Sequence, residues 1–202
     1  IILKPQAKIS WKTTHRLLTS LALLSTSRGK EASGAAFLSD QSIHFIKEPI
    51  SASKLMKGKN YSKYIDHAGS IFGVQNAQPM AFIGHSRLVT NGTQYAHQNN
   101  QPVKSHGMVA IHNGIVTNVD QIWQANKDLK QETDLDTEVL LALISKHFKQ
   151  TRKLKTSIRA SFQEMEGAAS LALFFAELDS IVLVTNTGSL YVAESPDYGI
   201  TL

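Results

Sequence analysis

Two apolar segments that both end in clusters of polar side chains constrain the fold of this chain most. Residues 80–89 have the sequence MAFIGHSRLV, and residues 107–116 have the sequence GMVAIHNGIV. Apolar runs of this length are typical of buried strands. Residues 91–106 between them are rich in Asn, Gln and His, so we expect a long loop there. Within the second segment, Asn113-Gly114 predicts a tight turn, because both residues tolerate positive φ.

The remaining segments divide into runs of helices and runs of strands. Helices are predicted over 11–27, 118–129, 136–148 and 153–166, and strands over 34–40, 42–48, 168–177, 180–186 and 189–195. Residues 50–78 show only a weak pattern, and we expect short helices and loops. Since strands and helices come in runs rather than in alternation, the order predicts a layered α+β fold, with antiparallel sheets and helices on their outer faces.

The composition indicates one domain over residues 1–202, with 42% hydrophobic residues. The chain begins with IILKP and ends with YGITL, so we expect its first and last strands to be cut. The net charge is +5, but the lysines are scattered from Lys4 to Lys155, which argues against nucleic-acid binding. No segment resembles a membrane span or a leader, and there is no cysteine. These features predict a cytoplasmic protein without disulfides and without membrane association.

Several kinds of site are excluded by missing motifs. The eight histidines lack the spacing of a metal site, and neither a GxSxG elbow nor a phosphate-binding glycine loop is present. We therefore expect no metal and no cofactor. Arg87 offers a planar fork for a carboxylate, Asp136 an acceptor for an ammonium group, and Asn113 with Gly114 an oxyanion hole. This set suits an α-amino acid that undergoes acyl transfer. Taken singly, the same residues could form an ion pair, cap a helix and turn the chain.

At these residues the sequence resembles the class II glutamine amidotransferase domains, which are N-terminal nucleophile (Ntn) hydrolases. It is most similar to the glutaminase domains of glucosamine-6-phosphate synthase and of glutamine phosphoribosylpyrophosphate amidotransferase. Five ordered segments carry the resemblance, namely RGKEASGAAF (28–37), GHSRLVTNG (84–92), NNQPV (99–103), HNGIVTN (112–118) and DTEVL (136–140).

The resemblance implies a four-layer αββα sandwich that hydrolyses the side-chain amide of glutamine and passes ammonia to an acceptor (synthase) domain or subunit. In this family an N-terminal Cys is the nucleophile, and its own α-amino group is the base. The resemblance also implies roles for single residues. Arg87 binds the glutamine α-carboxylate, Asp136 binds the α-amino group, Thr90 and Gln101 line the substrate pocket, Asn113 and Gly114 form the oxyanion hole, and Arg28 lies close to the nucleophile.

The missing cysteine separates two hypotheses about function. In the first, the nucleophile lies just upstream of Ile1, and the chain is the glutaminase part of an amidotransferase. In the second, the domain has no nucleophile and keeps only glutamine binding or an assembly role.

Overall fold

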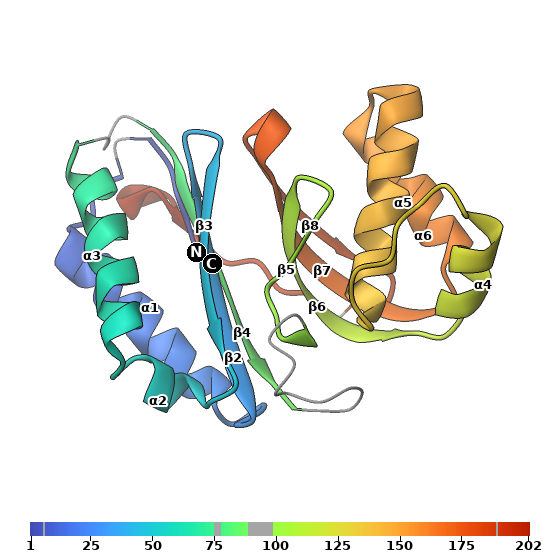
Figure 1. The fold of residues 1–202 in the computed structure, drawn as a ribbon. Coiled ribbons are helices and arrows are strands. Elements are labelled where there is room, and N and C mark those ends of the chain that lie inside the picture. The colour runs from blue at the N-terminus through green and yellow to red at the C-terminus, as the bar shows by residue number, and fades with distance from the viewer. Residues whose placement is uncertain (6, 75–77, 89–98, 189) are drawn as a thin grey trace.

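Two antiparallel sheets pack face to face, and helices cover the outer face of each sheet (Figure 1). The computed structural model describes the whole chain except residues 6, 75–77, 89–98 and 189. The result is a four-layer αββα sandwich, which confirms the predicted fold class.

The larger sheet has six strands in the order β3-β2-β4-β1-β10-β9. Its strands are β1 (Ile2–Leu3), β2 (Ala32–Ser39), β3 (Ser42–Glu48), β4 (Met80–Arg87), β9 (Glu194–Ser195) and β10 (Ile200–Thr201). The smaller sheet has four strands in the order β5-β6-β7-β8. They are β5 (Val103–Ser105), β6 (Met108–Val116), β7 (Gly167–Phe175) and β8 (Ser180–Thr185). Every pairing in both sheets is antiparallel.

Each sheet has its own helical layer (Figure 1). Helices α1 (Trp11–Ser25), α2 (Ala52–Leu55) and α3 (Lys59–Val74) cover the six-stranded sheet, and α4 (Val119–Ala125), α5 (Asp136–Thr151) and α6 (Leu154–Glu164) cover the four-stranded sheet. Short 3-10 turns follow β7 at Ala176–Leu178 and β9 at Pro196–Tyr198. None of the helices in the described residues has both the length and the apolar character that crossing a bilayer requires.

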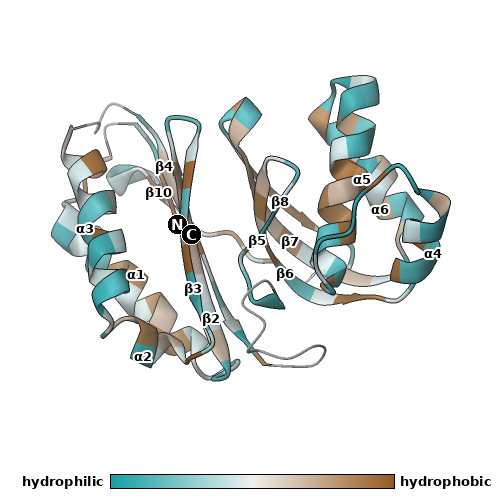
Figure 2. Cartoon of the chain, viewed as in Figure 1, coloured by the Kyte–Doolittle hydropathy of each residue, from teal (hydrophilic) through white to brown (hydrophobic). Residues whose placement is uncertain are grey.

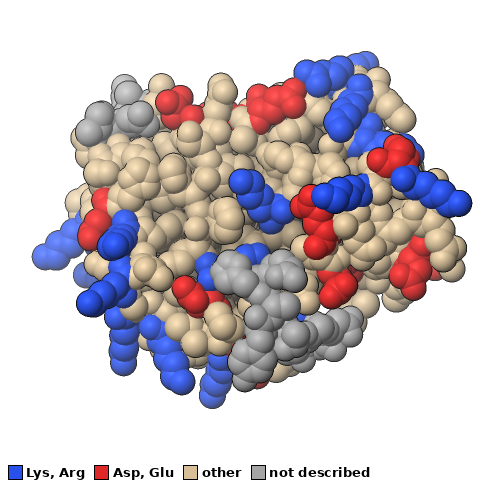
Figure 3. All heavy atoms as spheres, in the orientation of Figure 1, with Lys and Arg blue, Asp and Glu red and all other residues tan. Residues whose placement is uncertain are grey.

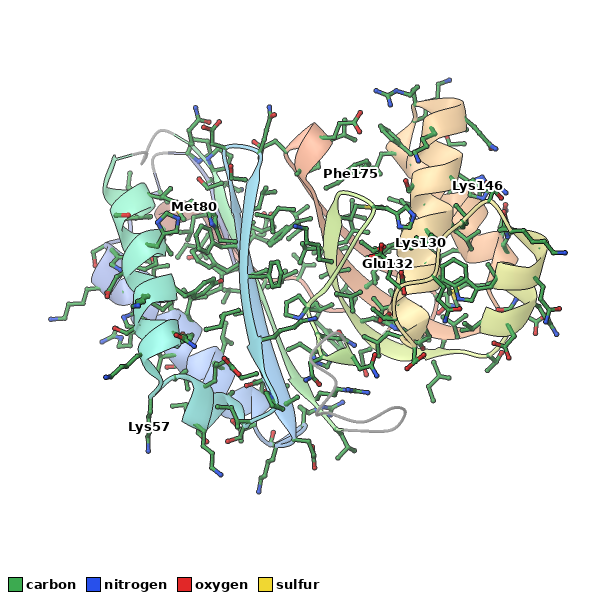
Figure 4. The ribbon with its side chains drawn as sticks, viewed as in Figure 1. Lys57, Met80, Lys130, Glu132, Lys146 and Phe175 are labelled. Carbon is green, nitrogen blue, oxygen red and sulfur yellow. The ribbon has the colours of Figure 1, made fainter. Side chains whose placement is uncertain are left out.

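The core follows from the alternation of side chains along the strands. Met80 and Phe82 of β4 face the helices α1 and α3, whereas Ala81 and Ile83 face the other sheet, where they meet Phe174 of β7. On the far side of the four-stranded sheet, Phe175 packs its ring edge against Phe148 of α5, at 4.9 Å between centroids. Figure 2 shows apolar residues along the strands of both sheets, and Figure 4 labels Met80 and Phe175 on opposite sides of the sandwich.

Charged side chains lie mainly over the outer layers. On the face drawn in Figure 3, most Lys and Arg lie over the two helical layers, a few lie near the centre, and Asp and Glu lie among them. This distribution is that of a solvated surface with a net charge of +5.

Several predicted elements are confirmed. Helix α1 begins at Trp11 behind the Ser10 cap, whose side chain accepts from the Thr13 N–H at 3.2 Å. The strands predicted over 34–40 and 42–48 are β2 and β3, which form a hairpin whose turn residues Asp40 and Gln41 have φ of 48° and 59°.

Other predictions are wrong in part. Within residues 50–78, the short helix α2 is followed by the 16-residue helix α3 rather than by further short helices, because Tyr61, Ile65, Ala68 and Phe72 give α3 one continuous buried face. The expected loop over 91–106 contains the strand β5. Of the strand expected over 189–195, the described residues 190–195 form only β9.

The predicted turn at Asn113-Gly114 is also wrong. Strand β6 continues through both residues, which pair with Ser170 and Ala169 of β7. Gly114 has a φ of 143°, and a Cβ there would lie 2.0 Å from the Ala168 carbonyl oxygen. The glycine is therefore explained by a close approach of two strands rather than by a turn.

Candidate active site

Alternate side chains at the end of β4 point into the space between the sheets. Ile83 belongs to the core between the sheets, so the alternation along β4 places His85 and Arg87 on the same inner face. Ser86 faces the other way and shares a 2.7 Å hydrogen bond with the Ser25 hydroxyl of α1. One strand thus supplies both a packed core and the polar side chains at its end.

Arg87 is buried and contacts the segment that precedes β5. Its Nη1 donates to the Asn99 carbonyl oxygen at 2.5 Å and to Asn100 Oδ1 at 3.1 Å. Burial lowers the pKa of Arg87, and the charge of Asp136 opposes that shift. The segment that precedes β5 therefore holds the Arg87 guanidinium in place.

The Asn113 side chain points from β6 of the four-stranded sheet toward the six-stranded sheet, which carries Arg87. Val109 and Ile111 of β6 pack in the core between the sheets, and Asn113 continues that face with an exposed side chain. The strand therefore directs the Asn113 amide toward the inner face of the six-stranded sheet, at the open end of the sandwich.

The Gln101 side chain pairs with the backbone of β6. Gln101 Nε2 donates to the His112 carbonyl oxygen at 2.9 Å, and the His112 N–H donates to Gln101 Oε1 at 2.6 Å. The Gln101 side-chain amide thus makes the two hydrogen bonds to His112 that a backbone peptide group would make if β5 extended to this position. Because antiparallel residues alternate between the two edges of a strand, the N–H of Gly114 points to the same edge as that of His112.

Asp136 lies at the first turn of α5, next to that edge. Its Oδ2 accepts from the Val116 N–H at 3.0 Å, and its Oδ1 lies 3.4 Å from His112 Nδ1. Burial alone would raise the pKa of Asp136, but hydrogen bonds from His112, Val116 and Thr137 outweigh it and lower the pKa. The Asp136 side chain thus contacts β6, and Leu135 rather than Asp136 occupies the N-cap position of α5.

Glu138 fixes the loop that leads into α5. Its buried carboxylate accepts from the Glu132 N–H at 2.8 Å, and also from the N–H and hydroxyl of Thr133 at 2.6 and 2.8 Å. Three hydrogen bonds to one ionised group hold the loop firmly, and they fix the position at which Asp136 enters the helix.

The two other predicted site residues are less informative. Arg28 is exposed in the turn after α1, and the adjacent Gly29 packs so closely on Arg87 that a Cβ would lie 2.2 Å from the Arg87 carbonyl carbon. This contact brings the turn against the end of β4. Thr90 lies outside the described residues.

Two histidines at the site were not predicted to belong to it. His85 and His112 come from facing sheets, and within the described residues His85 Nδ1 and His112 Nε2 are buried without a hydrogen-bond partner. Burial, together with the charges of His112 and Arg87, lowers the pKa of His85 to about 4. Each histidine lies within one of the five ordered segments, and this membership was the available signal. Among the described residues, no group of three His, Cys, Asp or Glu side chains could hold a metal ion.

Comparison with known proteins identifies the family of this arrangement. A profile described as glutamine amidotransferase domain matches residues 85–201, which is more than half of the chain. The chain belongs to the glutamine amidotransferase domain family. The resemblance of its five ordered segments is thereby confirmed at the level of the family.

Relatives of this amidotransferase domain are longer proteins. The glutamine–fructose-6-phosphate aminotransferase of Rhizobium leguminosarum bv. viciae is 27% identical over 177 residues, covering 87% of this chain and 27% of the relative. That of Bacillus subtilis (strain 168) is 25% identical over 179 residues, covering 86% of this chain and 27% of the relative. The chain therefore spans about a quarter of the length of these relatives.

Solved structures of low sequence identity share the fold. The glutamine phosphoribosylpyrophosphate amidotransferase of B. subtilis, complexed with ADP and GMP, superposes with a TM-score of 0.59 at 20% identity, covering 95% of this chain and 37% of that one. A structure described as the allosteric regulatory enzyme of purine biosynthesis gives a TM-score of 0.62 with the same identity and coverages. The amidotransferase domain thus has the sandwich architecture of both.

Proposed function

We propose that this domain hydrolyses the side-chain amide of glutamine to glutamate and ammonia, and that the ammonia passes to an acceptor domain or subunit. The observation that carries the proposal is a chain of contacts that connects Arg87 with Asp136. Arg87 contacts Asn99 and Asn100, and the adjacent Gln101 pairs with the backbone of His112. Asp136 contacts His112 and Val116 of β6, the strand that carries Asn113 and Gly114. A cation, an anion and oxyanion donors in one site match the three functional groups of glutamine.

Arg87 and Asp136 would bind the amino-acid end of the substrate. The Arg87 fork suits the α-carboxylate, and its contact with Asn99 and Asn100 holds it in one orientation. The Asp136 side chain is 24% exposed, and an ionised carboxylate accepts more hydrogen bonds than the one from Val116. It can therefore also accept from the substrate ammonium group. We assign Thr90 and Gln101 to the lining of the same pocket.

Asn113 and Gly114 would stabilise the tetrahedral intermediate. A cysteine thiolate attacks the amide carbon of glutamine, its proton having passed to the α-amino group of the same cysteine. The carbonyl oxygen becomes an oxyanion, which accepts from the Asn113 amide and the Gly114 N–H. The carbon–nitrogen bond then breaks, the proton goes to the leaving nitrogen as ammonia forms, and water hydrolyses the thioester to glutamate. The reaction requires neither a metal nor a cofactor.

The register of β1 supports a nucleophile upstream of Ile1. β1 pairs with β4 in a register that sets Ile2 opposite Ala81, so preceding residues would run along β4 toward Gly84 and His85. Arg28, in the turn packed on Arg87, would lie near such a nucleophile.

The acceptor is a separate question. The names of the relatives and of the B. subtilis structure share glutamine but differ in the second substrate, which is fructose 6-phosphate or phosphoribosylpyrophosphate. We therefore propose glutamine as the donor and leave the acceptor class open. A cytoplasmic location remains a prediction.

Arg87→Ala tests the substrate-binding assignment. We expect glutamine hydrolysis by the intact protein to be abolished at limiting glutamine, mainly through lost substrate binding, because the α-carboxylate loses its cationic partner. Ammonia release measured over a range of glutamine concentrations would show this. Arg152→Ala is the matched control, since that arginine pairs with Glu177 on the surface. Unchanged turnover in Arg87→Ala at limiting glutamine would refute the role.

The N-terminal sequence of the intact protein tests the nucleophile. A mature N-terminus that starts with Cys followed by Gly supports the enzyme. An N-terminus without Cys, Ser or Thr at that position would leave the alternative, a non-catalytic glutamine-binding or assembly domain.

A further inference from the structure

Lys47 lies on the inner face of the six-stranded sheet, in line with the candidate site. The strand register places Lys47 of β3, Gly34 of β2 and His85 of β4 side by side. Lys47 also has the phase of Ile43, which packs in the core between the sheets, and only 8% of Lys47 is exposed. A lysine with this burial needs polar partners, because a desolvated ammonium group is unfavourable without them.

Among the described residues, two carbonyl groups that flank Gln101 accept hydrogen bonds from Lys47. Lys47 Nζ donates to the Asn100 carbonyl oxygen at 2.7 Å and to the Pro102 carbonyl oxygen at 3.1 Å. The segment 99–102 can lie this close to the sheet because the residue between Lys47 and His85 in the strand register is Gly34, which has no side chain. A Cβ on Gly34 would be 2.4 Å from the Gln101 carbonyl oxygen.

The same segment contacts both halves of the site. At one end, the Asn99 carbonyl oxygen and Asn100 Oδ1 accept from Arg87 Nη1. At the other end, the Gln101 amide pairs with the backbone of His112, directly before Asn113. The ammonium group therefore holds the piece of chain that orients the Arg87 fork and connects it to β6.

The charge of Lys47 strengthens these contacts. Hydrogen bonds from an ionised donor are roughly twice as strong as neutral ones. Burial lowers the pKa of Lys47 to about 8, so the group remains mostly protonated at neutral pH. Arginine could supply the same charge and donors, whereas methionine has a similar length and neither.

We propose that Lys47 is a positioning residue for glutamine: by holding segment 99–102 it orients Arg87 toward the substrate α-carboxylate. The inference rests on the proposed function. It assigns Lys47 no contact with the substrate, so its effect is expected on glutamine binding rather than on the chemical step.

The test compares Lys47→Met, Lys47→Arg and Lys146→Met in the intact protein. Lys146 of α5 is the matched control (Figure 4). It is a partly buried lysine that donates to the side-chain amide oxygen of Asn126, in the outer helical layer. Glutamine hydrolysis gives KM and kcat, and calorimetric titration with glutamine gives Kd. For Lys47→Met we expect KM and Kd to rise about tenfold with kcat changed less than about threefold, the loss of one charge-assisted contact. Lys47→Arg should restore both constants to within about threefold of wild type, and Lys146→Met should leave them unchanged.

Each other outcome has a definite meaning. Wild-type KM and Kd in Lys47→Met would overturn the inference, as would a fall in kcat alone or a failure of Lys47→Arg to restore binding. If Lys47→Met does not yield folded protein, Lys47→Gln carries the same test with the same expected split between KM and kcat. A wild-type protein that neither binds nor hydrolyses glutamine would refute the proposed function itself, whereas an active wild type with unaffected Lys47 variants would refute the positioning role only.

Discussion

At the scale of single residues, Asn113 and Gly114 differ in how they meet the candidate site. The Asn113 side chain leaves the face of β6 toward the other sheet, while the Gly114 N–H points along the strand edge. Two donors that approach from a face and from an edge can converge on one oxygen atom. Since the strand holds both groups, little reorganisation is needed when an oxyanion forms.

Asn113→Ala tests this arrangement. We expect kcat for glutamine hydrolysis to fall by roughly two to three orders of magnitude, the usual effect of removing one oxyanion donor. Asn126→Ala serves as the control, because that buried amide bonds the Ile122 carbonyl oxygen in the outer helical layer. A turnover number for Asn113→Ala equal to that of the control would show that the side chain has no such role.

At the scale of elements, β2 shapes the site through a missing side chain. The segment 99–102 rests on Gly34, so the spacing between this segment and the sheet depends on one glycine. By contrast, Gly73 in α3 has no atom within 4 Å of its hypothetical Cβ. The two glycines allow matched Gly→Ala substitutions with opposite expectations.

Gly34→Ala should displace segment 99–102, because its Cβ would also lie 2.7 Å from Pro102 Cδ and 2.8 Å from the Ile46 carbonyl oxygen. We expect a loss of roughly 1–3 kcal/mol in the free energy of unfolding, as for other overpacked sites, together with a raised KM for glutamine. Gly73→Ala should instead gain roughly 0.5–1 kcal/mol, because alanine favours a helix. Urea titrations of both variants measure these changes, and equal stabilities would contradict the account.

The elements also show how far the sequence could predict this site. Apolar periodicity located β4, β6 and α5, since their buried faces are continuous. The places of Arg87, Asn113 and Asp136 in these elements could therefore be predicted. The turn predicted at Asn113-Gly114 was wrong, because pairing with β7 decides the conformation of this dipeptide and β7 is distant in sequence. Lys47 was missed for a similar reason, as its partners lie more than fifty residues away. A lysine in phase with Ile43 was the only local signal.

At the scale of the whole molecule, a half-buried histidine, His85, lies between the two sheets. His85 is held neutral, with a pKa of about 4 against 6.5 for an ordinary histidine. The unfolded chain takes up a proton near pH 6.5, which the folded chain does not bind until about pH 4. The free energy of unfolding therefore falls as the pH drops through this window.

His85→Asn should weaken that dependence. Between pH 7 and pH 5, we expect the wild type to lose roughly 1–2 kcal/mol more stability than the variant, because asparagine binds no proton. Urea titrations at both pH values measure the difference. Parallel losses in the two proteins would show that His85 titrates as it does in water.

The alternation along β4 also limits how this domain can change in length. Ala81 and Ile83 pack between the sheets, and His85 and Arg87 share their face. One residue inserted after Ile83 would turn Arg87 toward α1 and bring Ser86 into the site in its place. Natural variation in chain length should therefore accumulate outside β4, and a graft that transfers this site to another scaffold must carry the strand intact from its core end.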